Sequence, residues 1–117
     1  MEYALLITEP PGQRQSRSES EGHAVYDRML HYADDLKSRG VLRLAQSLKT
    51  DTTGVRVKVR DGRRTLLDGP FSEAKEMIGG FFIVDCESRD EAIAIASAMP
   101  AAEWATVEVR ELGPCFA

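Results

Sequence analysis

Two short segments of this chain are apolar on both of the sides that a β-strand would present. In residues 2–8 the apolar side chains alternate between the two sides: Tyr3, Leu5 and Ile7 on one, Ala4 and Leu6 on the other. Residues 81–84 read Phe-Phe-Ile-Val. Such patterns are typical of strands that are buried on both faces of a sheet. If Leu6, Phe82 and their neighbours faced water, each would forgo roughly 1.5–3 kcal/mol of burial free energy, so we expect a sheet that is covered on both faces.

Two helices are predicted from their start and stop signals. Ser18 and Glu21 have the spacing of a capping box, and Gly40 suits the left-handed conformation that commonly ends a helix. The apolar stripe of this first helix follows at steps of three and four: Tyr26, Met29, Leu30, Ala33 and Leu36. Ser88 and Glu91 form a second capping box, and the helix that they open should end before Pro100.

The other elements are shorter. Further strands are predicted at residues 41–48, 55–60, 63–67 and 106–112. Asp61-Gly62 tolerates the positive φ angles of a two-residue turn, so the second and third of these strands should form a hairpin. Residues 72–77 are predicted to form a short helix.

This order of elements predicts an α+β fold of the ferredoxin-like layout, β-α-β-β-α-β with an added hairpin. Two helices can cover only one face of the sheet, so the other face needs a second cover. We expect a second copy of the chain to supply it, sheet against sheet with Phe82 in the interface, because two-fold dimers are the commonest oligomers. The alternative is that the hairpin and the polar loop at residues 9–20 fold over that face.

Length and composition narrow the class of protein. The 117 residues suit one domain, and 43% hydrophobic with 29% charged residues is ordinary for a globular chain. The net charge of −4 disfavours a general nucleic-acid binder, whose affinity comes from clustered Lys and Arg. No run approaches the roughly 18 apolar residues of a membrane span, and the acidic start is unlike a signal peptide. We therefore expect a cytoplasmic protein without a nucleic-acid or membrane partner.

One segment, residues 68–76, is more elaborate than a connection requires. It reads Asp-Gly-Pro-Phe-Ser-Glu-Ala-Lys-Glu. Pro70 fixes its own φ and Gly69 favours an extended or left-handed geometry, so the chain should turn sharply and rigidly here. Asp68 is suited to accept backbone N–H bonds in an Asx turn, the commonest use of Asp before Gly.

This segment resembles the signature of the DGPF family, D-G-P-F-x-E-x-K-E, within the wider YCII-related superfamily. The matched positions are Asp68, Gly69, Pro70, Phe71, Glu73, Lys75 and Glu76. Further similarity at residues 3–7, 40–42, 79–81 and 107–110 extends the resemblance over almost the whole chain, which we take as a single domain, residues 1–117. The resemblance implies a ferredoxin-like fold that pairs as a dimeric α+β barrel, with a cleft near the signature. It implies little about activity.

Two departures from the superfamily limit what the resemblance implies. In its YCII branch, a His–Asp pair is proposed to be catalytic. The equivalent positions here are Met29 and Met99. Neither methionine can move a proton, so that proposal does not transfer. DGPF proteins often show His-Gly before the last strand, where this chain has Trp104-Ala105.

The candidate site residues are Asp68 as the catalytic group and His23, Phe71, Glu73 and Lys75 as ligand-binding groups. Two functions stay open. In the first, a cleft near the signature binds a small molecule, with or without weak acid–base activity. In the second, the protein is a non-catalytic interaction or regulatory module and the signature is purely structural. No motif indicates a metal or a cofactor, and we predict neither.

Two further charged patterns are best explained as ordinary surfaces. One helical stripe combines Asp27, His31 and Asp35, but it lies opposite the apolar stripe and is expected to be solvated. One side of the hairpin strand combines Arg56, Lys58 and Arg60. We interpret it as an edge that resists aggregation, with an anion site as the alternative.

Overall fold

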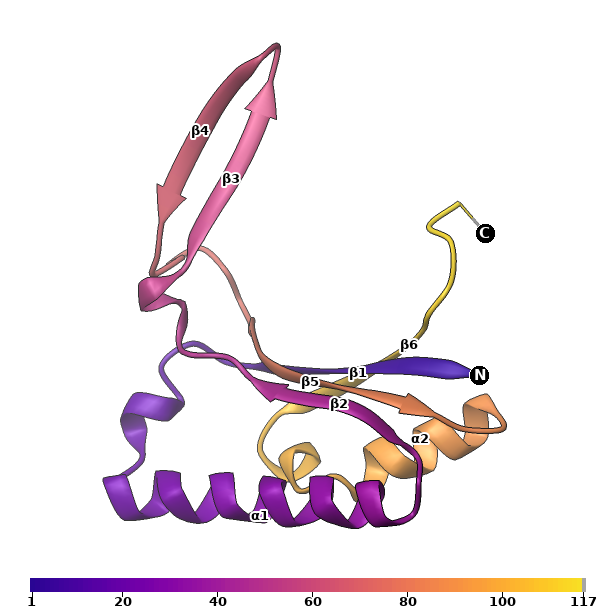
Figure 1. Ribbon diagram of the computed structural model, residues 1–117. Coiled ribbons are helices and arrows are strands. Elements are labelled where there is room, and N and C mark those ends of the chain that lie inside the picture. Colours follow the sequence, from indigo (N-terminus) through magenta and orange to yellow (C-terminus); the bar gives the residue numbers. More distant parts are fainter. Residues whose placement is uncertain (117) are drawn as a thin grey trace.

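The computed structural model describes residues 1–116, which form a four-stranded sheet, two helices on one of its faces and a separate hairpin (Figure 1). The helices and strands are, in chain order, β1 (Glu2–Glu9), α1 (Glu19–Ser38), β2 (Leu42–Ser47), β3 (Val55–Arg60), β4 (Arg63–Asp68), β5 (Met77–Asp85), α2 (Arg89–Ala98) and β6 (Thr106–Glu111). Short 3₁₀ helices lie in the connections: η1 (Arg14–Ser16), η2 (Asp51–Thr53) and η3 (Pro100–Glu103). Within residues 1–116, no helix has both the length and the hydrophobicity needed to cross a membrane.

The strand order in the sheet is β2-β5-β1-β6, and all neighbouring strands are antiparallel. β5 lies between β1 and β2, and β1 lies between β5 and β6, so each long helix connects two strands that a third one separates. This is the ferredoxin-like arrangement of two split β-α-β units. The predicted α+β fold with an added hairpin is therefore confirmed.

Local capping interactions set the ends of the helices. The Ser18 hydroxyl accepts a hydrogen bond from the Glu21 N–H at 3.2 Å, and the Glu21 carboxylate accepts one from the Ser18 N–H at 3.0 Å. Hydrogen bonding to Ser18 lowers the pKa of the Glu21 carboxyl from its ordinary value. The backbone N–H of Ser18 has the larger effect and its side chain the smaller one. Gly40, with a φ of 75°, follows α1, and the Ser88 hydroxyl accepts from the Glu91 N–H at the start of α2. The predicted capping signals are confirmed.

The pairing of β1 with β5 decides which apolar side chains share a face. Leu5 lies opposite Phe82 and Leu6 lies opposite Phe81, and residues directly opposite each other point to the same side. The face toward the helices carries the buried side chains of these strands: Tyr3, Leu5, Ile7, Phe82 and Val84. The other face, called the open face below, carries apolar side chains that are partly buried or exposed: Ala4, Leu6, Leu44, Phe81 and Ile83.

The expectation that Phe82 lies in a sheet-to-sheet interface is wrong. Phe82 is 4% exposed on the helix face, and its ring centroid lies 6.4 Å from that of Tyr32 in α1. The reason is register. Because side chains alternate along a strand, Phe81 reaches the open face beside Leu6, and Phe82 does not.

The β3–β4 hairpin, residues 55–68, is called the arm below. Its two strands pair with each other, with Val57 opposite Leu66, and every residue of both strands is exposed. Figure 1 shows the arm rising from one end of the sheet, on the side away from the helices. The polar loop lies elsewhere, where Gln13 donates a hydrogen bond to the Trp104 carbonyl at 2.7 Å. The alternative in which the hairpin folds over the open face is therefore wrong.

The short helix predicted at residues 72–77 is also wrong. These residues form a turn, in which the Ala74 N–H donates to the Phe71 carbonyl at 3.0 Å, and β5 already begins at Met77. Strand pairing prevails over the local helical preference because Met77 extends the ladder opposite Glu9.

Replacing Leu5 with alanine should lower the free energy of unfolding by about 2–5 kcal/mol, because this side chain is fully buried on the helix face. The matched change Leu6→Ala, on the partly buried open face, should cost markedly less. Denaturant unfolding measures both changes, at a protein concentration low enough to keep copies of the chain apart. Equal losses in the two variants would contradict this assignment of faces.

Candidate functional site

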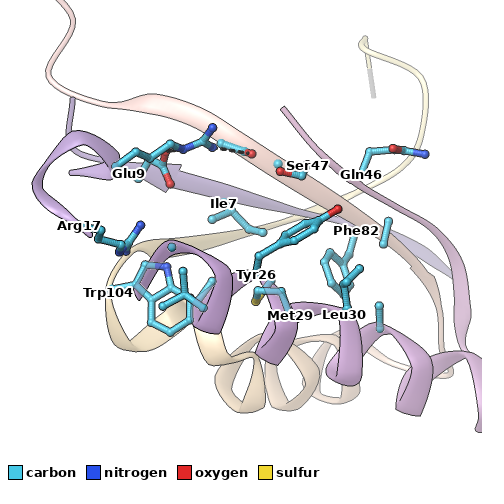
Figure 2. Close-up of a pocket in the computed structure, with 18 residues that line it drawn as sticks. Ile7, Glu9, Arg17, Tyr26, Met29, Leu30, Gln46, Ser47, Phe82 and Trp104 are labelled. Atoms are coloured by element: carbon cyan, nitrogen blue, oxygen red, sulfur yellow. Dashed lines mark hydrogen bonds and ion pairs between the residues drawn. The ribbon is translucent and has the colours of Figure 1, made fainter. Parts of the chain in front are cut away.

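A cavity of about 360 Å³ lies between residues 22–33 of α1 and the helix face of the sheet (Figure 2). Its large apolar lining comes from three places: Ile7 and Phe82 from the sheet, Tyr26, Met29 and Leu30 from α1, and Trp104 from the segment after η3. The charged side chains of Glu9, Arg14 and Arg17 also line it. An apolar space of this size with a few polar groups is typical of small-molecule sites.

Small residues on the surrounding elements create this space: Ala33 on α1, Ala45 on β2, Gly79 and Gly80 on β5, and Ala101 in η3. The apolar stripe of α1 is therefore fully buried only near the end of the helix. Leu36 is fully buried there, whereas Tyr26 is 52% and Leu30 is 46% exposed at the cavity. The stripe from Tyr26 to Ala33 thus borders an unfilled apolar space.

Glu9 is a charged side chain buried at one end of the cavity, with 5% of its surface exposed. The Arg14 guanidinium donates from Nε to its Oε1 at 2.5 Å. The remaining guanidinium nitrogens donate to the carbonyls of Leu48 at 2.6 Å and Gly79 at 3.0 Å. A buried carboxylate needs such a partner, and the bonds from one arginine join β1, β5 and the segment after β2.

A β-bulge makes room for this ion pair. The register between β1 and β5 shifts by one residue at this point, which leaves Gly79 without a partner on β1. A Cβ atom at Gly79 would lie 2.8 Å from both the Glu9 carboxylate and the Arg14 guanidinium. Glycine is therefore required here by the close approach of the charged pair.

Two arginines stack on Trp104 beside the same end of the cavity. The guanidinium carbon of Arg17 lies 5.6 Å and that of Arg28 5.4 Å from the centroid of its ring, within the range of cation–π attraction. Arg28 is also paired with Glu103. Within residues 1–116, Arg17 forms no ion pair, so its charge is available to a ligand in the cavity that it lines.

The structure does not bring the five predicted site residues together at this cavity. The exposed ones are Asp68 at the end of β4, Glu73, Lys75 and His23. The His23 Nε2 lies 4.0 Å from Glu19, one turn earlier on α1. Phe71 is partly buried outside the cavity, with the Arg56 guanidinium carbon 4.0 Å from its ring centroid. The roles assigned to these five residues stay predictions.

The signature segment instead joins the base of the arm to η2. The Gly69 N–H donates to the Gly54 carbonyl at 2.8 Å, and the Phe71 N–H donates to the Asp51 carboxylate at 3.1 Å. A Cβ atom at Gly69 would lie 1.7 Å from the Asp51 carbonyl oxygen, so only glycine permits this approach. Arg56 of β3 then covers the Phe71 ring. These contacts hold the two ends of the arm together.

Sequence reasoning missed Glu9, Arg14 and Arg17, although one signal for Glu9 was present. Residue 9 continues the alternation of Tyr3, Leu5 and Ile7, so it falls on the buried side of its strand. A buried carboxylate requires a cationic partner. Nothing in the sequence singles out Arg14 among the chain's basic residues, because its role depends on contacts with segments far along the chain.

Other reactive groups do not add chemistry to the cavity. Two methionines occupy the positions of the His–Asp pair. Met29 lines the cavity, and Met99 is 1% exposed in the core. Burial raises the pKa of the Cys86 thiol, and its nearby Glu91 carboxylate adds to this, so the reactive thiolate is disfavoured. In the described part of the chain, no group of three or more His, Cys, Asp or Glu could hold a metal ion.

Replacing Arg14 with methionine should lower the free energy of unfolding by about 3 kcal/mol, because the buried Glu9 carboxylate loses its partner. The control Arg17→Met removes an equal charge at the same end of the cavity. It should cost less than about 1 kcal/mol, the value of an exposed cation–π contact. Denaturant unfolding measures both, and similar losses would contradict the central role of the Glu9–Arg14 pair.

Gly69→Ala should loosen the base of the arm, because the added Cβ cannot fit against the Asp51 carbonyl. We expect faster amide hydrogen exchange, measured by NMR, at Gly54 and Phe71, because the Gly54 N–H donates to the Asp51 carbonyl at 2.9 Å and the Phe71 N–H donates to the Asp51 carboxylate. Gly113→Ala is the control, since a Cβ there meets no atom within 4 Å. Unchanged exchange in the Gly69 variant would show that the signature does not hold the arm.

Comparison with known proteins agrees with this fold. The sequence matches the YCII-related domain over residues 1–115. The uncharacterized protein R00369 of Rhizobium meliloti (strain 1021) is 30% identical over 114 residues, which cover 96% of this chain and 92% of that protein. A solved structure of the 5-chloro-2-hydroxyhydroquinone dehydrochlorinase TftG from Burkholderia phenoliruptrix AC1100, in complex with 2,5-dihydroxybenzoquinone, has a TM-score of 0.57 and 21% identity, and the likeness covers 97% of this chain and 94% of that one. The chain belongs to the YCII-related domain family.

Proposed function

We propose that this protein binds a small, flat, largely apolar molecule with one anionic or hydrogen-bonding end in the cavity between α1 and the sheet. The observation that carries the proposal is the half-exposed stripe of Tyr26 and Leu30 around an unfilled space of about 360 Å³. Large apolar side chains in that position gain burial free energy when a ligand fills the space. The volume lies at the small end of the range for ligand sites, which suits a single-ring compound.

The cavity has a direction that would orient such a ligand. In Figure 2, Phe82, Met29 and Leu30 lie toward one end, and Glu9 and Arg17 lie toward the other. A ring would pack among the apolar side chains, while a carboxylate, phenolate or hydroxyl would face the Arg17 guanidinium. A hydroxyl of the ligand could also donate to the Glu9 carboxylate.

The solved TftG complex supports the class of ligand only in a general way. That protein holds 2,5-dihydroxybenzoquinone, a small flat ring with oxygen substituents. At 21% identity the likeness concerns the fold, so the ligand class proposed for this chain rests on its own cavity.

Binding without turnover is the form of the proposal that the residues favour. Met29 lines the cavity at the position equivalent to the histidine of the His–Asp pair in the YCII branch. Methionine cannot transfer a proton. Glu9 already accepts from Arg14. Weak acid–base activity centred on Asp68 is a separate hypothesis, since Asp68 lies at the end of β4 outside the cavity lining.

The second candidate function is a non-catalytic regulatory module, in which the signature is structural. The contacts of Gly69 and Phe71 with Gly54 and Asp51 favour a structural role for that segment. This role is compatible with ligand binding at the cavity.

We also propose that the chain belongs to the DGPF branch of its family. The support is the nine-residue match, which has seven fixed positions.

We further propose that the protein is a homodimer in which the open face of one copy packs on that of the other. The support is the cluster of apolar side chains that no element of the described chain covers: Ala4, Leu6, Leu44, Phe81 and Ile83. Sheets pack face to face at a separation of about 10 Å when their facing side chains are apolar.

A thermal-shift screen against monocyclic aromatic acids, phenols and quinones tests the ligand proposal. At a hundredfold excess over Kd, a ligand should raise the free energy of unfolding by about 2.7 kcal/mol, and Tm by roughly 10–20 °C for a chain of this size. Ala33→Leu, which fills the cavity from α1, should abolish the shift. Ala24→Leu, on the exposed face of the same helix, should leave it unchanged.

Asp68→Asn distinguishes the cavity from the signature as the binding place. A ligand that stabilises wild type and Asp68→Asn but not Ala33→Leu binds in the cavity, as proposed. A ligand whose effect disappears in Asp68→Asn and persists in Ala33→Leu would overturn the cavity proposal and place the site at the signature. Absence of any stabilising compound in these classes would overturn the assigned ligand chemistry.

A further inference from the structure

The arm is a large feature of the molecule that ligand binding in the cavity does not use. One of its faces carries four exposed apolar side chains: Val55 at 51%, Val57 at 57%, Val59 at 57% and Leu66 at 55%. Val57 and Leu66 lie opposite each other, so these side chains form one continuous patch. A two-stranded hairpin on its own is at most marginally stable in water, and an exposed apolar patch of this kind marks an interaction surface.

The position of the arm gives it reach beyond its own sheet. Each of its strands has six residues, which corresponds to a length of about 20 Å. The arm rises on the side of the open face (Figure 1). Two sheets that pack face to face lie only about 10 Å apart. An arm of this length would therefore pass the edge of a second sheet on the open face and lie along the body of that second copy.

The area of the open face alone is small for a stable dimer. Four strands spaced about 4.8 Å apart and about 20 Å long present roughly 400 Å², about half of the 800 Å² that each partner buries in a standard interface. One face of the two-stranded arm adds roughly 200 Å², and the surface that receives the partner's arm adds a similar amount. With both arms engaged, each copy would bury about the area of a standard interface.

Charge favours a second copy over other occupants. The arm carries five basic and two acidic side chains, a net charge of +3, while the whole chain has a net charge of −4. The rest of the chain therefore carries −7. A basic arm is attracted to the acidic body of an identical chain, whereas that same body repels a nucleic acid.

The base of the arm is held in place before any partner binds. The Gly69 N–H bonds to the Gly54 carbonyl, the Phe71 N–H bonds to the Asp51 carboxylate, and Arg56 covers the Phe71 ring. A preorganised arm loses less conformational entropy on association than a mobile one. Preorganisation of the arm gives the nine-residue signature a role although it lies outside the cavity.

We infer that the arm of each copy packs its apolar face along the body of a second copy, and that the two arms clasp the dimer whose open faces meet. The inference rests on the proposed sheet-to-sheet dimer and extends it. It assigns to Val55, Val57, Val59 and Leu66 a role in association, and to the signature the role of setting the direction of the arm.

The test is a matched pair of variants on opposite faces of the arm. Val57→Asp places a charge in the apolar patch, and Thr65→Asp places the same charge on the other face, opposite Lys58. Both lower the net charge of the arm equally, so electrostatic attraction is matched. Sedimentation equilibrium should show a dimer Kd at least about tenfold higher for Val57→Asp, and a Kd close to that of wild type for Thr65→Asp. Equal Kd values for the two variants would overturn the inference.

A direct contact measurement uses wild-type protein and so does not depend on the folding of a variant. In an equal mixture of ¹³C-labelled and unlabelled protein, the methyl groups of Val57 and Leu66 should show intermolecular NOEs. Methyl groups that show only intramolecular NOEs in a dimeric sample would overturn the inference.

The variant Phe81→Asp separates failure of this inference from failure of the proposed dimer. If Phe81→Asp is monomeric while Val57→Asp remains as dimeric as wild type, the open-face dimer stands and the role of the arm falls. If wild type is monomeric at every concentration, both fall, while ligand binding in the cavity is unaffected. Titration with a labelled DNA duplex provides the last outcome: salt-dependent binding that Lys58→Glu weakens and Val57→Asp does not would assign the arm to nucleic acid instead.

Discussion

A sheet that is apolar on both faces, in a chain whose two helices both lie on one of them, is the constraint on which the rest of this structure depends. The helix face buries Leu5, Phe82 and Val84, and this core holds the ferredoxin-like fold together. The open face keeps Leu6 and Phe81 only partly buried. Burial free energy of roughly 1.5–3 kcal/mol for each large side chain acts on that second face as well, and this is the physical reason for the dimer that we propose.

The cavity arises where the same helix face lacks large side chains. Gly79 and Gly80 line the cavity without a side chain that could fill it, and the bulge at Gly79 admits the Glu9–Arg14 pair. One local irregularity therefore does two things. It opens an apolar space, and it brings a charged pair to the end of that space, where a carboxylate alone would be costly to bury. Ion pairing and cavity formation are parts of the same arrangement.

The signature at residues 68–76 illustrates how a specific motif can be unrelated to the cavity of the fold that carries it. Its glycine allows a close approach to the Asp51 carbonyl, and its phenylalanine N–H is bound by the Asp51 carboxylate. Both contacts lie at the base of the arm. The cavity lies on the opposite side of the sheet from the arm, between the sheet and α1 (Figures 1 and 2), and its charged residues come from the start of the chain.

Local patterns determined much of this protein without any tertiary information. Ser18 and Glu21 mark the start of α1, Gly40 follows its end, and Asp61-Gly62 closes the hairpin, because capping and turn geometry depend on neighbours within a few residues. Alternation along residues 2–8 identified two apolar faces. Only the tertiary structure decided that Phe81, and not Phe82, shares the open face with Leu6. It also decided that residues 72–76 form a turn before β5 and that Arg14 reaches Glu9. Each of these depends on strand register and on contacts between segments far apart in the chain, which a period of two or of 3.6 residues does not specify.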